Sequence, residues 1–253
     1  MSVPFRFSMS FFDLFLGALL AFFATSAGAA LVLPIKDMKG SLFALLSAFS
    51  GGVMAFSALE MLSQSHAVSG DMVAIAGLAL GLCAFFIIEK LLPHAHAFMK
   101  RAPLEQKKKK AALLAGTITL HNIPEGFAIA SAFAASPSLG WLVAGTMAIQ
   151  DFPEGLIVSA PLAAYGMGKH HSFFWGAFSG FVEFLAAIVG FLFLSQVISA
   201  TPFALAFSAG AMIFVTFSEL LPDSLRACGN ARALASFAAG ILLAYGISAL
   251  VAI

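Results

Sequence analysis

Two short motifs bring together side chains that can bind a metal ion or carry protons. The first is His121-Asn122-Ile123-Pro124-Glu125-Gly126, and it returns 29 residues later as Gln150-Asp151-Phe152-Pro153-Glu154-Gly155. On a helix, residues three or four positions apart share a face, so the polar members of each motif would lie together. Each proline lacks an N–H group and frees a backbone carbonyl one turn earlier, which then needs another partner. Imidazole, amide and carboxylate groups without a thiolate suit a borderline or hard divalent cation.

The composition indicates that these motifs lie in a membrane. The chain has 253 residues, of which 61% are hydrophobic and 10% charged, and its mean hydropathy is +1.00. A soluble domain is nearer 45–50% apolar and about 25% charged. The composition therefore excludes a secreted disulfide scaffold, a disordered chain and an ordinary cytosolic enzyme. A net charge of +1 gives no sign of a nucleic-acid partner, and Cys83 and Cys228 are isolated residues that we interpret as packing groups.

The apolar stretches predict an all-α, polytopic membrane protein with eight transmembrane helices. A span needs roughly 20 apolar residues. The predicted spans cover about 10–33, 41–64, 72–93, 111–135, 139–165, 172–198, 202–221 and 232–252. The breaks are short, and the longest is a basic loop at about 94–110, so we expect residues 1–253 to form a single transmembrane transporter domain. A cleaved signal peptide is the alternative for the first span, because Arg6 precedes an apolar run that ends in small residues.

The positions of the cations predict the orientation of these spans. Twelve of the thirteen Lys and Arg residues fall on one side of the predicted membrane, and only Arg6 falls on the other. Because cytoplasmic loops carry an excess of Lys and Arg, both termini should be extracytoplasmic and the 94–110 loop cytoplasmic. The short loops favour a bacterial inner (plasma) membrane, where the Lys107–Lys110 run would also contact anionic lipid.

The sequence also predicts inverted repeats. The two motifs lie on the fourth and fifth spans, which run in opposite directions. A weaker similarity links Gly52-Val53-Met54-Ala55-Phe56, followed by Glu60, to Gly210-Ala211-Met212-Ile213-Phe214, followed by Glu219. These segments lie on the second and seventh spans, which are also antiparallel. Inverted repeats are typical of secondary transporters, although chance similarity among small apolar residues is the alternative for the second pair.

Counting along the spans places four carboxylates near the middle of the membrane. Glu125, Asp151, Glu154 and Glu183 each lie about 11–16 residues into a span, and no Lys or Arg occurs between 111 and 168 or between 171 and 225. A bare carboxylate at the bilayer centre costs at least a few kcal/mol. The layer must therefore hold protons or bind metal. The alternative is that these residues only form hydrogen bonds between helices.

The two Pro-Glu-Gly motifs resemble those of the ZIP (Zrt/Irt-like protein) family of divalent metal transporters. The resemblance covers nearly the whole chain and extends to the eight spans, the external termini and the basic, His-containing loop. It implies uptake of metal into the cytoplasm, an inverted-repeat bundle and a sliding, elevator-like motion. It also implies that zinc is the first candidate substrate, with Cd²⁺, Fe²⁺ or Mn²⁺ as further candidates, and that no resident cofactor is needed.

The resemblance also implies the two-metal site of some members of this family, and matching positions exist here. One ion would meet His121, Glu125, Gln150 and Glu154. The second ion would meet Asn122, Asp151 and Glu183, with Glu125 and Glu154 bridging the two. Two departures matter: Gln150 stands where the family often has His, and Phe184 stands where it often has Pro.

Residues outside this layer are weaker candidates for the transport path. Glu60, Ser63 and His66 are predicted near its outer mouth, and Glu219 and Asp223 near its inner mouth. His94 and His96 are candidates for metal capture in the cytoplasmic loop. Small residues such as Gly77 and Gly81 allow packing within or between subunits, which leaves a homodimer open.

Two other functions compete with metal import. An intramembrane metal hydrolase would need an open metal position and a general base, but the chain has no HExxH motif and its ligand types recur symmetrically. A proton-coupled transporter of organic substrates would also use carboxylates, but the layer has no Lys or Arg to bind a substrate anion.

Overall fold

The described part of the chain folds almost entirely into helices. The computed structural model describes residues 10–34, 40–91, 104–164 and 166–251, and no strand occurs within those ranges. The elements are α1 (Phe11–Ala30), α2 (Gly40–Leu91), α3 (Leu104–Ala135), α4 (Pro137–Ala164), α5 (Lys169–Gln196), η2 (Ile198–Ala200), α6 (Thr201–Val215), η3 (Thr216–Leu220), α7 (Leu221–Cys228) and α8 (Asn230–Val251).

Five of the described helical stretches are long and apolar enough to cross a membrane. They are α1, α2, α5, the continuous stretch Ile198–Cys228, and α8. The 52-residue α2 contains both the second and the third predicted spans. The fourth and fifth predicted spans lie in α3 and α4, which are not among the five. These two helices carry the polar motifs, and their polar side chains lower the hydropathy that an apolar span requires.

A single glycine replaces the loop predicted between the second and third spans. Gly70, with φ 75° and ψ −178°, is the one non-helical residue inside α2. A positive φ is accessible to glycine at little cost. The bend is flanked by an ion pair between His66 Nδ1 and Asp71 Oδ1 at 3.0 Å, with both side chains more than half exposed. The sequence thus located the break correctly, and Gly70 separates two helices within α2.

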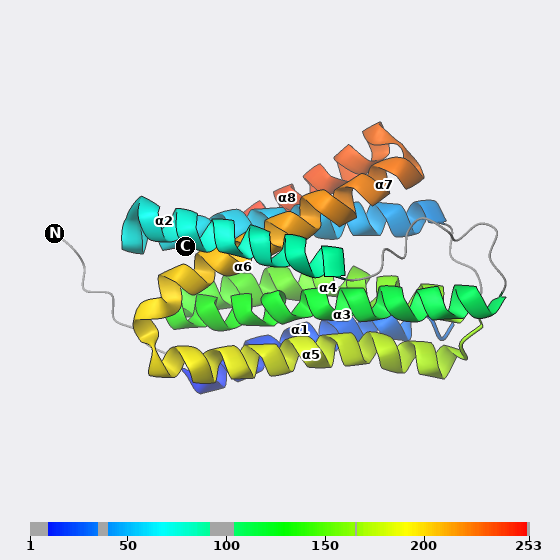
Figure 1. Cartoon of the computed structure of the whole chain (residues 1–253), viewed down its shortest axis with the longest axis horizontal. Coiled ribbons are helices and arrows are strands. Elements are labelled where there is room, and N and C mark those ends of the chain that lie inside the picture. The colour runs from blue at the N-terminus through cyan, green and yellow to red at the C-terminus, as the bar shows by residue number, and fades with distance from the viewer. Residues whose placement is uncertain (1–9, 35–39, 92–103, 165, 252–253) are drawn as a thin grey trace.

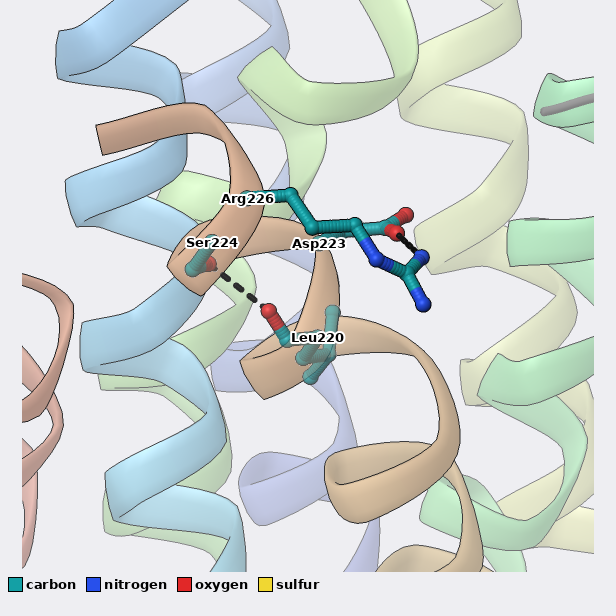
Figure 2. Close-up of polar contacts among 4 residues, drawn as sticks. All are labelled: Leu220, Asp223, Ser224 and Arg226. Atoms are coloured by element: carbon teal, nitrogen blue, oxygen red, sulfur yellow. Dashed lines mark hydrogen bonds and ion pairs between the residues drawn. The ribbon is translucent and has the colours of Figure 1, made fainter. Parts of the chain in front are cut away.

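Two helices extend beyond the predicted spans. The α3 helix begins at Leu104, so the last part of the expected 94–110 loop is helical. The seventh span continues past residue 221 to Cys228, where Gly229 (φ 85°) ends α7. The π-helical turn η3 ends two residues before Pro222, and such a widened turn accommodates a residue without an N–H group. Figure 2 shows the next turn, in which Ser224 Oγ donates to the Leu220 carbonyl at 2.7 Å.

The helices form two groups that lie side by side (Figure 1). We call α1, α3, α4 and α5 the motif bundle, and α2 with α6, η3, α7 and α8 the flanking bundle. The start of α1 and the end of α8 lie at the same end of the molecule. The two bundles meet mainly where α2 packs on α4 and where α3 packs on α6. The largest apolar core cluster includes residues of both bundles and fills this boundary.

Glycines join the helices closely inside each bundle. In the motif bundle, a Cβ at Gly28 would collide with the backbone of Phe152, and one at Gly155 with the backbone of Thr25. In the flanking bundle, Gly52 meets the backbone of Phe237 in the same way. Among the described glycines, every contact of this kind with a backbone lies within one bundle. Each bundle is therefore packed backbone to backbone, whereas the boundary is packed through side chains.

Candidate metal centre

Three buried carboxylates meet where α3 packs on α4. Oxygen atoms of Glu125, Asp151 and Glu154 all lie within 4.8 Å of one another. The three residues are 1%, 0% and 8% exposed. Three negative groups this close and this well removed from water repel one another unless protons or a cation neutralise them. The arrangement is suited to a divalent cation with oxygen ligands.

The two motifs build this cluster through their prolines and glycines. Pro124 and Pro153 lie inside continuous helices, so the polar residues stay at helical spacing on either side of them. Gly126 lets α3 approach α5 so closely that a Cβ there would collide with the carbonyl of Glu183. The missing side chain at position 126 therefore brings the Glu183 turn of α5 beside the motif of α3.

Gln150 connects the two motifs. Its Nε2 donates a 2.8 Å hydrogen bond to Glu125 Oε1, and both residues are fully buried. Its Oε1 has no hydrogen-bond partner among the described residues. A side-chain amide has a donor end and an acceptor end. Here the donor end faces the carboxylate, and a rotated amide would present its oxygen to a cation instead.

The side of the site next to α5 is formed by Asp151, Glu183 and Asn122. The carboxylates of Asp151 and Glu183 interact with each other, and Glu183 also interacts with Asn122. All three residues are 0% exposed. No oxygen of either carboxylate has a partner that meets full hydrogen-bond geometry within the described part of the chain. Buried polar atoms are nearly always satisfied in folded proteins, so these oxygens are unusual.

His121 faces the other bundle. Its Nε2 lies 3.5 Å from Oε1 of Glu219, which belongs to η3, and its ring lies 5.9 Å from the ring of Phe85 in α2. His121 is therefore not one of the three residues that converge in the carboxylate cluster. The sequence placed Glu219 at an inner mouth of the path, whereas the structure places it against the first residue of the first motif.

The other predicted path residues lie apart from the cluster. Glu60 is half-buried and Ser63 exposed on α2, and His66 pairs with Asp71 as described above. Asp223 pairs with Arg226 at 3.1 Å, also drawn in Figure 2. His94 and His96 lie outside the described residues.

Two residues of the site were not singled out from the sequence. Ser50 Oγ donates to the backbone carbonyl of Gln150 at 3.0 Å, and Phe85 packs on His121. Neither the type nor the spacing of these two residues identifies them as part of the site, because serine and phenylalanine recur throughout the spans. The similarity between the second and seventh spans was the one available signal for Ser50, since this residue lies two positions before the repeated segment.

An assembly of apolar helices around a buried acidic cluster defines an integral membrane protein of the metal-transport class. Comparisons with known proteins agree. The family model described as ZIP Zinc transporter matches residues 99–253. The zinc transporter ZupT of Escherichia fergusonii is 35% identical over 214 residues, which cover 81% of this chain and 83% of that protein. The zinc transporter GufA of Myxococcus xanthus is 35% identical over 239 residues, which cover 90% and 94% of the two chains. The chain belongs to the ZIP zinc transporter family.

Proposed function

We propose that this protein imports zinc into the cytoplasm through a site at the middle of the membrane between α3, α4 and α5. The observation that carries the proposal is the convergence of Glu125, Asp151 and Glu154, which are buried together and whose sequence neighbourhood lacks a Lys or Arg. Membership of the family supports zinc as the substrate. The inward direction follows the resemblance set out above.

We further propose that the site takes two ions. Glu125 and Glu154 would bridge the two ions. His121 and Gln150 would complete the first ion, and the second ion would be held by Asn122, Asp151 and Glu183. The unsatisfied oxygens of Asp151 and Glu183 support this second position, since a cation would satisfy them. For the first ion, the Gln150 amide would rotate away from Glu125, and His121 would leave Glu219.

Ion preference follows from the donor atoms. The ligands are carboxylate and amide oxygens with one imidazole, and none is a thiolate. Such a set accepts zinc and also Cd²⁺, Fe²⁺ and Mn²⁺, because affinity among first-row divalent ions depends on geometry and availability as well as ligand type. Replacement of the usual imidazole by Gln150 removes one of the stronger zinc ligands.

The proposed arrangement in the membrane has eight crossings in one domain, with both termini outside and the 94–110 segment inside. The bend at Gly70 supports two crossings within α2, and the start of α1 and the end of α8 share one end of the molecule. The lysine and arginine bias points the other end toward the cytoplasm. We place the protein in a bacterial inner membrane, as either a monomer or a homodimer surrounded by lipid.

Alternating access would come from movement of the motif bundle against the flanking bundle. Close glycine contacts hold each bundle together, whereas the described hydrogen bonds across the boundary are few. One is the hydrogen bond from Ser57 Oγ to Thr146 Oγ1, at 2.8 Å. Packed units of this kind slide as bodies more readily than they deform.

Zinc uptake into proteoliposomes tests the proposal. The wild-type protein should accumulate zinc, and Glu154→Ala and His121→Ala should lose most of this uptake. Ser195→Ala is a matched control, because Ser195 is exposed on α5 and its hydroxyl bonds within its own helix. Equal uptake by the wild type and both site variants would overturn the proposal.

A further inference from the structure

One hydrogen bond ties the flanking bundle to the turn that carries the second motif. Ser50 Oγ of α2 donates to the carbonyl of Gln150 in α4 at 3.0 Å. Ser50 is 2% exposed and Gln150 is fully buried. The contact fixes the backbone at the residue next to Asp151. Ser50 thus holds part of the site without touching a ligand atom.

The repeats assign Ser50 a counterpart in the other half of the chain. Gly52–Phe56 matches Gly210–Phe214, and the same offset pairs Ser50 with Ser208. The two motifs pair Gln150 with His121. The symmetry-related counterpart of the Ser50–Gln150 contact is therefore a contact between Ser208 and the backbone of α3 near His121.

The π-helical turn accounts for the one irregularity in this alignment. Glu60 and Glu219 match only when one residue is added after Phe214. The turn η3, Thr216–Leu220, begins two residues after Phe214 and contains Glu219. A π-bulge inserts one residue into a helix without ending it. The register that pairs Ser50 with Ser208 is therefore undisturbed upstream of the bulge.

Ser208 is buried and unsatisfied in the structure described here. It is 0% exposed, and its Oγ has no hydrogen-bond partner within the described ranges. Its neighbours one turn away on the same face of α6, Ala204 and Met212, belong to core clusters that also contain α3 residues. The hydroxyl therefore lies on the face of α6 that meets the motif bundle. A buried hydroxyl without a partner is costly and calls for an explanation.

We propose that Ser50 and Ser208 are alternating positioning residues of the transport cycle. Ser50 holds the motif bundle in the arrangement seen here, in which Val143 and Thr146 are buried near the α2–α4 boundary. In the opposite arrangement Ser50 releases Gln150, and Ser208 donates to a backbone carbonyl of α3 at or beside His121. The inference rests on the proposed function, because inverted repeats exchange their conformations only when access alternates.

Thiol labelling from outside tests this exchange. Val143 is 0% exposed on α4 and lies one turn from Thr146, which bonds to Ser57 across the boundary. The reporter is Val143→Cys in a background of Cys83→Ser and Cys228→Ser, reconstituted in vesicles and treated with an impermeant maleimide. Labelling should be slow in the arrangement described here and fast in the opposite one.

The two serines should shift this rate in opposite directions. Ser50→Ala removes a hydrogen bond from the present arrangement, so labelling should become about threefold to tenfold faster. Ser208→Ala removes one from the opposite arrangement, so labelling should slow by a similar factor. The double variant should return to within roughly twofold of the parent rate, since the two effects oppose each other. Ser47→Ala is the matched control, because Ser47 bonds to Phe43 in its own helix, and it should change nothing.

The outcomes separate this inference from the proposed function. Opposite shifts in the two variants, with zinc uptake by the parent protein, support the exchange. Shifts of the same sign, or rates equal to that of Ser47→Ala, would overturn it while leaving zinc import intact. A parent protein that does not take up zinc would overturn the proposed function and the inference with it.

Discussion

The first residues of the two Pro-Glu-Gly motifs have different partners, although their glutamates meet in one cluster. The side chain of Gln150 donates to Glu125 within the motif bundle. His121 instead reaches Glu219 in the flanking bundle. The amide therefore joins the two motifs to each other, whereas the imidazole links the site to the neighbouring helices. The repeated motif thus supplies equivalent glutamates and two unlike contacts at the edges of the site.

The largest effect is expected where the motifs are equivalent. Glu125→Gln and Glu154→Gln each replace a carboxylate of the central cluster. Changes to outer-shell partners already cost about 10–100-fold in metal affinity or activity, and loss of a direct ligand should cost more. Both variants should therefore lose zinc uptake to the level of empty vesicles. If only one of them does so, the two motifs do not contribute equally.

The motif glycines should be equally intolerant of a side chain. Gly126→Ala would collide with the backbone of Glu183, and Gly155→Ala with that of Thr25. Overpacking in a well-packed core typically costs about 1–3 kcal/mol, and a backbone obstacle leaves little room to relax. Both variants should lower the thermal unfolding temperature in detergent. Gly145→Ala on the same α4 has open space around it and should not, so equal shifts in all three would contradict this packing.

Exchanging the residue types at the first positions of the two motifs should change the apparent KM for zinc in opposite directions. Gln150→His supplies a stronger zinc ligand, and a gain of about 1.4 kcal/mol would lower the apparent KM for zinc roughly tenfold. His121→Gln should raise the KM and also remove the contact with Glu219. Uptake kinetics over a range of zinc concentrations measure both. An unchanged KM in both variants would mean that neither residue binds the ion.

A smaller effect is expected at the partner of His121. Glu219→Gln keeps the shape of the side chain but removes its charge. Because Glu219 lies outside the cluster of three carboxylates, uptake should fall only several-fold, by roughly the value of one ordinary hydrogen bond. Complete loss of uptake in this variant would make Glu219 part of the central site.

The smallest effect is expected at the bend of α2. The His66–Asp71 pair is largely exposed, and such pairs contribute about 0–1 kcal/mol. Asp71→Asn should leave zinc uptake and thermal unfolding unchanged within error. A clear loss of uptake in Asp71→Asn would instead assign the bend of α2 to the path.

Periodicity and composition predicted much of this molecule. They identified the apolar helices and the break near Gly70, and they singled out Glu125, Asp151 and Glu154, which the structure brings together. They did not predict which way His121 turns, because that depends on the rotation of α3 against α6, and helical spacing carries no information about a neighbouring helix. They also ended the seventh span at residue 221, before Pro222, since the π-helical turn that lets the helix continue has no marker in the sequence.

Ser50 shows the same limit. Its type and spacing are ordinary for a membrane helix, and its contact with the Gln150 carbonyl depends on the register between α2 and α4. Only the weak repeat around Gly52 and Gly210 marks it. The glutamates could be identified because a charged group in a membrane is costly wherever it lies.

Anomalous diffraction at the zinc edge tests the central claim most directly. In crystals grown with zinc, the account predicts one or two anomalous peaks bounded by Glu125, Asp151 and Glu154, and none there in the Glu125→Gln/Glu154→Gln double variant. Well-occupied zinc elsewhere in the wild-type protein, with no peak among these three carboxylates, would contradict it.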